Sequence, residues 1–265
     1  MLGFGGITKH RIIGSVILLA LGAAAGSVFG QLTVGLDMHE MREYLPLLVR
    51  GIAITLYVTS VTFIAGSLLA LLVAAASVSG PPALKWMANC HFQLFRSTPL
   101  IAQLYLVYYG AGEISPQLDA IGVWWMFREP MNCVLVVFTL NTSAYQAYVL
   151  AGAIRSLPRE QREAAHALGL GNLVVLWKVL IPQALLIAIR PLGNELTKMI
   201  KASSIASVVT IFDLLGTTRL IYSETFNFNY FILTGAIYVS LVEFTRIGVE
   251  GFSSRLERHR KLVLR

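Results

Sequence analysis

The chain has 265 residues, of which 56% are hydrophobic and only 13% are charged. Soluble proteins average about 45–50% apolar and about 25% charged residues, so this composition excludes an ordinary soluble domain. The net charge of +7 could suggest a nucleic-acid-binding protein. However, no basic patch is interleaved with aromatic residues, and five basic residues directly follow the last apolar run. We therefore expect membrane topology, not nucleic acid, to explain the charge.

Apolar stretches long enough to cross a bilayer recur along the chain. A crossing helix needs about 20 mainly apolar residues, and backbone exposed to lipid must satisfy its own hydrogen bonds. The sequence therefore predicts an all-α, multi-pass membrane protein. The six expected spans are Ile12–Gly30, Gly51–Ala76, Met87–Tyr109, Met131–Ile154, Val179–Ile200 and Asn229–Gly248. The apolar run Ser203–Leu215 has 13 residues, which favours a re-entrant or interfacial element over a seventh span.

We expect three regions: residues 1–50 as an N-terminal helix with an external linker, residues 51–250 as the transmembrane domain, and residues 251–265 as a basic cytoplasmic tail. The first apolar run also resembles a secretory signal peptide, because Lys9 and Arg11 precede it and alanines follow near its end. A retained helix and a cleaved peptide both stay open, and we favour the retained helix. The remaining topology is the same in both cases.

The positions of the basic residues predict the orientation. With six spans, one side of the membrane carries twelve Lys and Arg residues: Lys9, Arg11, Lys85, Arg155, Arg159, Arg162, Lys178, Arg255, Arg258, Arg260, Lys261 and Arg265. The other side carries four: Arg42, Arg50, Arg128 and Arg219. The positive-inside rule therefore predicts that both termini are cytoplasmic. Cys90 and Cys133 fall at opposite membrane ends of their spans, beyond disulfide reach, so we expect packed thiols.

The cytoplasmic loop at residues 156–178 contains the pattern of a short helix. Pro158 suits a first helical turn, where its missing N–H would have no partner, and Glu163 lies near the positive end of the helix dipole. Arg159 and Glu163 have the i, i+4 spacing of an ion pair. Gly169 can end the helix in a left-handed conformation. The pattern predicts about three helical turns, and a solvated amphipathic connector is the alternative. The small apolar side consists of Ala164, Ala165 and Leu168.

Several stretches in the same order carry a resemblance to a known family. They are Phe95-Arg96-Ser97-Thr98-Pro99-Leu100, Asn141-Thr142-Ser143-Ala144-Tyr145, Glu163-Ala164-Ala165 with Gly169 and Ile181-Pro182, Gly193-Asn194-Glu195, and Lys201-Ala202-Ser203-Ser204. Together they resemble the ABC importer permeases of the polar amino-acid uptake branch, especially the M-type permeases for histidine, lysine, arginine and ornithine and for opines. The stretch around Glu163 is similar to the EAA signature of that family. At one position the chain departs from the pattern, because Tyr148 stands where relatives usually have glutamate.

This resemblance implies a type I ABC importer transmembrane domain, with a five-helix core to which Ile12–Gly30 adds an extra N-terminal helix. It implies that the loop forms a coupling helix that docks on a dimer of cytoplasmic ATP-binding subunits. The implied coupling residues are Glu163, Ala164, Ala165, Leu168, Gly169 and Pro182. A homologous second permease subunit, an external solute-binding protein, an amino-acid substrate and the bacterial inner membrane are also implied, with membrane lipid around the spans.

The chain contains no Gly-Lys dipeptide and hence no Walker A motif. We therefore expect no catalytic residue, cofactor or metal in this chain, and we assign ATP hydrolysis to a partner subunit. The predicted function is an ATP-driven importer subunit for a polar, basic amino acid or an opine-like derivative. Glutamine, glutamate or cystine are alternative substrates. A secondary transporter, a channel or an intramembrane enzyme is less favoured, because we find no inverted repeat, filter motif or paired catalytic groups.

Polar residues within or beside the spans are the predicted substrate contacts: Arg96, Gln103, Asn141, Tyr145, Gln146, Tyr148, Glu195 and Lys198. A charge at the bilayer centre costs at least about 2.5–3.5 kcal/mol, so such a residue usually faces a cavity or a partner. Glu195 and Lys198 could form a structural pair or could line the path. Tyr145, Gln146 and Tyr148 lie close together in one predicted helix. Their polar groups could form hydrogen bonds between helices, or the aromatic faces could hold a cationic substrate by cation–π contact.

Overall fold

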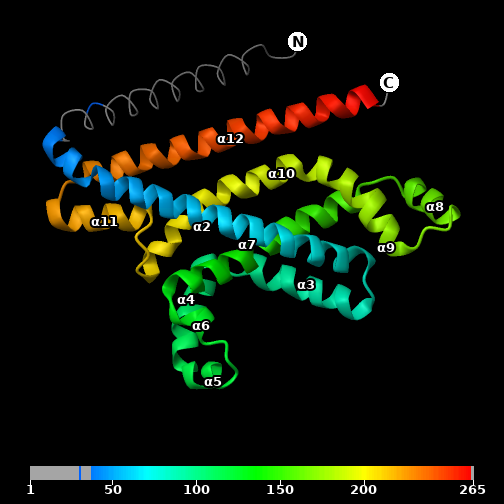
Figure 1. Cartoon of the computed structure of the whole chain (residues 1–265), viewed down its shortest axis with the longest axis horizontal. Coiled ribbons are helices and arrows are strands. Elements are labelled where there is room, and N and C mark those ends of the chain that lie inside the picture. The colour runs from blue at the N-terminus through cyan, green and yellow to red at the C-terminus, as the bar shows by residue number, and fades with distance from the viewer. Residues whose placement is uncertain (1–29, 31–36, 264–265) are drawn as a thin grey trace, which may run out of the picture.

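The computed structural model describes residue 30 and residues 37–263, and the described residues form helices joined by short turns, without a strand (Figure 1). The expected span Ile12–Gly30 lies, except for its last residue, outside the described part of the chain. The elements are α2 (Met38–Ser79), α3 (Pro82–Ser97), α4 (Leu100–Glu113), α5 (Ser115–Ala120), α6 (Trp125–Arg128), α7 (Pro130–Arg155), α8 (Arg159–Ala167), α9 (Asn172–Val174), η1 (Val175–Leu180), α10 (Ile181–Ala202), η2 (Ser203–Val209), α11 (Leu214–Thr225) and α12 (Asn229–Val263).

Helices α2 and α7 pack against each other along the centre of the molecule. α2 begins at Met38, well before the expected span start at Gly51, and Asp37 caps it by accepting a 2.9 Å hydrogen bond from the backbone N–H of His39. Gly66 lets the two helices approach closely, because a Cβ there would lie 3.2 Å from the side chain of Thr142 on α7. In α7, 61% of the most apolar stretch is buried, so this helix is the core of the described fold.

The expected single span Met87–Tyr109 is wrong, because two helices cover this region. α3 ends at Ser97 and α4 starts at Leu100. Thr98 is extended at φ −110° and ψ 142°, the conformation that a following proline favours. Pro99 has no N–H and cannot continue the α3 hydrogen-bond ladder. Arg96, Ser97, Thr98 and Pro99 interrupt the apolar run here, and joining the apolar residues on both sides into one predicted span overlooked this interruption.

From Asn172 to Val209 the chain is helical throughout, but its geometry changes twice. η1 is a π-helical stretch in which the N–H of Ile181 donates to the carbonyl of Leu176, and Pro182 follows in the first turn of α10. A wider helical turn before a proline relieves the clash between its ring and the preceding turn. At the other end, Ser203–Leu215 forms no separate span, because η2 extends α10 in a 3₁₀ geometry and the chain turns at Thr210.

Four described helices are long and apolar enough to cross a membrane: His39–Ser79, Pro130–Arg155, Asn172–Val209 and Asn229–Arg255. In Figure 1, α8 and the turn between α2 and α3 lie at one end of the molecule, and α11 lies at the other end. The last turns of α12 also point toward the end that carries α8. The loop around α8 and the C-terminal end of α12 therefore belong to the same side of the bundle.

Candidate functional site

The helix predicted in the 156–178 loop is present as α8, Arg159–Ala167, directly behind Pro158. It has nine residues, so it is slightly shorter than the three turns expected from the sequence. The expected ion pair between Arg159 and Glu163 is wrong, because the ion pairs of the described residues involve other side chains. Both side chains are exposed, and such surface pairs contribute little even where they form.

Gly169 ends the helix as its sequence position predicts. It has a φ of +77°, in the left-handed region that glycine adopts without a Cβ penalty. Its N–H donates to the carbonyl of His166 at 2.9 Å, and the N–H of Leu170 donates to the carbonyl of Ala165 at 3.2 Å. These two bonds form a Schellman motif, which pairs carbonyls that the helix end leaves free. Leu170 also packs into the same apolar cluster as Ala165.

The two alanines of α8 face in different directions. Ala165 is buried in the apolar cluster that also contains Val175 and Leu176 of the following segment. Ala164 and Glu163 are exposed, and Leu168 is 80% exposed although it is a large apolar residue. Ala165 thus anchors α8 to the transmembrane bundle, while the other three present a surface away from it. Pro182, the remaining expected coupling residue, is exposed in the first turn of α10.

Two of the residues predicted as substrate contacts, Asn141 and Gln103, stabilise the break between α3 and α4. The amide nitrogen of Asn141 donates to the carbonyl of Phe95 at 2.9 Å and to the Oε1 of Gln103 at 3.0 Å. The amide nitrogen of Gln103 donates to the same Phe95 carbonyl and to the carbonyl of Thr98, both at 3.0 Å. Backbone groups released by a break in a membrane helix need such partners. Asn141 and Gln103 therefore act as caps across three helices.

Three other expected contacts, Arg96, Tyr145 and Tyr148, meet beside this break. The guanidinium carbon of Arg96 lies 3.6 Å from the ring centroid of Tyr148 and 5.6 Å from that of Tyr145. The Tyr145 hydroxyl donates to the Arg96 carbonyl at 3.5 Å. A hollow of about 440 Å³ opens here, lined by Asn89, Phe92, Gln93, Arg96, Ser97 and Tyr148. The aromatic faces that could hold a cationic substrate thus already hold a cation of the chain.

Arg96 has no acidic partner, because every ion pair found in residues 37–255 joins other side chains. Its Nε is buried without a hydrogen-bond partner in the described structure. A guanidinium in this state can bind a carboxylate through two parallel N–H···O bonds. The arrangement therefore suits an anionic group in the hollow.

The remaining expected contacts lie elsewhere. Glu195 and Lys198 form the ion pair expected from their spacing, with 2.8 Å between Nζ and Oε1 on α10. Gln146 is fully buried on α7, and neither its amide nitrogen nor its amide oxygen has a hydrogen-bond partner in the described structure. Of the two cysteines, Cys133 is buried as expected, but Cys90 is exposed, so its reading as a packed thiol is wrong.

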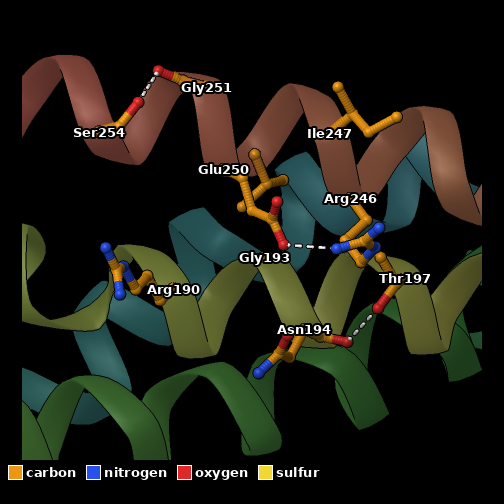
Figure 2. Close-up of a pocket in the computed structure, with 10 residues that line it drawn as sticks. Arg190, Gly193, Asn194, Thr197, Arg246, Ile247, Glu250, Gly251 and Ser254 are labelled. Atoms are coloured by element: carbon orange, nitrogen blue, oxygen red, sulfur yellow. Dashed lines mark hydrogen bonds and ion pairs between the residues drawn. The ribbon is translucent and has the colours of Figure 1, made fainter.

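A second hollow, of about 710 Å³, lies between α10 and α12 (Figure 2). Its arginines already have partners. Arg246 pairs with Glu243 at 2.7 Å and with Glu250 at 2.8 Å, and Arg190 donates to Ser253 at 3.1 Å. The arginines of this hollow thus bind side chains of the protein itself, Arg246 within α12 and Arg190 from α10 to α12. The hollow at Arg96 differs, because Arg96 has no acidic partner in the described structure.

One polar cluster was missed by the sequence reading. Asp213 is fully buried, accepts a 2.9 Å hydrogen bond from the N–H of Gly216, and accepts a 3.1 Å bond from the Tyr238 hydroxyl of α12. It lies between the apolar spans and caps α11. Burial raises the pKa of Asp213 to about 6, although the Gly216 and Tyr238 bonds oppose the shift. An aspartate directly before an apolar helix was the available signal.

Comparison with known proteins supports the resemblance seen in the sequence. The nopaline transport system permease protein NocM of Agrobacterium fabrum is 32% identical over 205 residues, which are 77% of this chain and 85% of that protein. The arginine ABC transporter permease protein ArtM of Escherichia coli is 32% identical over 199 residues, with 75% and 89% covered. The octopine transport system permease protein OccM of Rhizobium meliloti is 33% identical over 195 residues, with 73% and 79% covered.

Solved structures show the same architecture. A crystal structure of an amino acid ABC transporter with histidines superposes with a TM-score of 0.71 at 30% identity, covering 83% of this chain and 99% of that chain. An inward-facing structure of the MetNI methionine ABC transporter shares the fold alone, with a TM-score of 0.66 at 21% identity and the same coverage. The expected type I ABC importer fold is confirmed. Residues 66–258 match the family described as "Binding-protein-dependent transport system inner membrane component", and the chain belongs to this family of ABC importer permeases.

Proposed function

We propose that the chain is the permease subunit of an ATP-driven importer in which α8 transmits ATP hydrolysis to the membrane bundle. The observation that carries this proposal is the two-sided packing of α8. Ala165 fixes the helix to the bundle, while Glu163, Ala164 and Leu168 form an outward surface. An 80% exposed leucine beside exposed small residues suits insertion into a groove of a partner. The partner is a dimer of cytoplasmic ATP-binding subunits.

The proposed orientation follows from the same assignment. The end that carries α8, including the C-terminal part of α12, is cytoplasmic, and the end that carries α11 faces outward. The outer end receives substrate from a solute-binding protein, and a second, homologous permease subunit completes the path. Arg162, Arg159, Arg155 and Lys85 then lie on the inner side, in agreement with the positive-inside rule.

The proposed substrate is a free amino acid or an opine-like derivative, as the names of the arginine, nopaline and octopine relatives indicate. Arg96, held over the Tyr148 ring, would bind the α-carboxylate that all such substrates carry. The hollow at Arg96 has no acidic lining residue to pair with the side chain of a basic substrate. That side chain is therefore recognised by the second permease subunit or by the binding protein.

A charge placed on the outward surface of α8 tests the function. We expect Leu168→Asp to abolish co-purification of the ATP-binding subunit with the permease, because a carboxylate would be desolvated in the groove. Phe226→Asp is the matched control, since Phe226 is also a large apolar residue, 77% exposed, but lies next to α11 at the opposite end. Co-purification is measured without the binding protein. Unchanged ATPase recovery with Leu168→Asp would overturn the proposed coupling role.

A further inference from the structure

A strongly basic hollow of about 550 Å³ lies where α2, α3, α7 and α8 meet. We name it the basic hollow and define it by its four cationic lining residues, Lys85, Arg155, Arg159 and Arg162. Its other lining residues are neutral, so no carboxylate of the hollow offsets these charges. Four cations around one space repel one another unless an anion binds between them.

The four cations of the basic hollow have few partners within the chain. The guanidinium of Arg155 donates to the Ser77 hydroxyl at 2.9 Å, which fixes it at the hollow wall. Over the described residues, ion pairs form at Lys198 and Arg246, and none involves a cation of the basic hollow. Hydrogen-bonding capacity is therefore available for a ligand with several acceptor oxygens, such as a phosphate group.

The position of the basic hollow along the membrane normal follows from the ends of two apolar helices. Ser77 lies in the last turn of the span His39–Ser79, and Arg155 is the last residue of the span Pro130–Arg155. Both residues line the hollow. A charged side chain is costly inside the hydrocarbon core, so Arg155 at the end of an apolar helix places the hollow at the level of the lipid headgroups.

The surface next to the basic hollow has the composition of a membrane interface. On α3, Lys85 is flanked by Leu84 and Trp86, which are 44% and 68% exposed, and Met87 is 58% exposed. Tryptophan next to lysine is typical of the boundary between lipid and water. The hollow is thus next to a lipid-facing surface, while the outward residues of α8, Glu163 and Leu168, do not line it. This favours a lipid over an acidic segment of a partner protein.

We propose that the basic hollow binds the phosphate group of an anionic membrane lipid. Basic pockets between membrane helices on the cytoplasmic side bind such headgroups. Because Arg159 and Arg162 belong to α8, a bound headgroup would tie α8 to the ends of α2 and α7. This consequence for coupling rests on the proposed function, but the binding of the lipid does not.

Lipid binding can be measured directly at the hollow. A fluorophore is placed on Met87→Cys in the full chain with Cys90→Ser and Cys133→Ser, in nanodiscs of phosphatidylcholine. Quenching by brominated phosphatidylglycerol is compared with quenching by brominated phosphatidylcholine. We expect preferential quenching by phosphatidylglycerol, and we expect Lys85→Gln with Arg159→Gln to reduce that preference at least about fivefold.

Two control variants separate the site from charge in general. Lys178→Gln with Arg255→Gln removes the same charge from exposed positions outside the hollow and should leave the preference unchanged. Lys85→Arg with Arg159→Lys keeps the charges and should retain it. Equal quenching by the two lipids in the wild type, or equal loss in the outside variant, would overturn the proposal.

A separate arm of the experiment distinguishes a lipid phosphate from free inorganic phosphate. Displacement of the phosphatidylglycerol signal by millimolar inorganic phosphate would assign the hollow to a soluble anion and overturn the lipid proposal. The Leu168→Asp test is independent of this measurement. If Leu168→Asp abolishes co-purification of the ATP-binding subunit but the wild type shows no preference for phosphatidylglycerol, only the lipid site is refuted. If Leu168→Asp keeps the ATP-binding subunit and the wild type prefers phosphatidylglycerol, only the coupling role is refuted.

Discussion

The α8 loop and the break between α3 and α4 differ in how the chain specifies them. The signals that start and end α8 lie within a dozen residues, from Pro158 before its first turn to Gly169 after its end. At the break, Phe95 receives a hydrogen bond from Asn141, and Arg96 stacks on Tyr148, so the partners come from a distant helix. A local motif can be read from sequence, whereas a site assembled between helices depends on how the helices pack.

The largest expected effect concerns the assembled site. Arg96→Gln should lower uptake of every accepted amino acid about 100-fold, because the proposed charged hydrogen bonds to the substrate carboxylate would be lost. Arg96→Lys keeps the charge but not the planar stacking on Tyr148, so we expect an intermediate loss. Competition among arginine, histidine, glutamine and glutamate measures the ranking, which should not change. A variant that loses arginine but keeps glutamine would contradict carboxylate recognition.

A smaller effect is expected at the local site. Gly169→Leu should lower ATP hydrolysis stimulated by the binding protein about tenfold, because a left-handed non-glycine residue costs about 1–2 kcal/mol. Gly171→Leu is a close control: a Cβ would meet open space at both positions, but Gly171 has a φ of −69°. Equal activity of the two variants in proteoliposomes would show that the helix end does not matter for coupling.

A third comparison uses the buried carboxyl at the opposite end from α8. The pKa of Asp213 is about 6 in the fold, above its ordinary 3.8, so the folded state binds this proton more tightly. The stability that protonated Asp213 contributes is therefore fully present below pH 3.8 and is lost as the pH rises through about 6. We expect the melting temperature of the wild type to fall by about 5 °C between pH 4.5 and pH 7 through this group. Asp213→Asn keeps the bond to Gly216 but has no proton to lose, so it should remove this fall. The same pH dependence in both proteins would contradict this assignment.

The sequence predicted the all-α membrane fold, α8 and its glycine end because hydropathy, capping and turn signals are local. It also predicted the Glu195–Lys198 pair from helical spacing. The prediction of one span overlooked the break at Thr98, although Arg96, Ser97, Thr98 and Pro99 interrupt the apolar run there. The capping role of Asn141 and Gln103 could not be predicted. Which carbonyl they bind depends on the packing of α3, α4 and α7, a tertiary property.

The side of the membrane on which α8 lies tests the central claim most directly. Glu163→Cys and Phe226→Cys are each made with Cys90→Ser and Cys133→Ser, and each is labelled with a membrane-impermeant maleimide in right-side-out and inside-out vesicles. Both positions are exposed. Glu163 lies in α8 and Phe226 directly follows α11, and these two helices lie at opposite ends of the bundle (Figure 1). We predict that Glu163→Cys is labelled only in inside-out vesicles, with protection by the bound ATP-binding subunit, and that Phe226→Cys is labelled only in right-side-out vesicles. Labelling of position 163 from outside would contradict the assignment of α8 as the coupling helix.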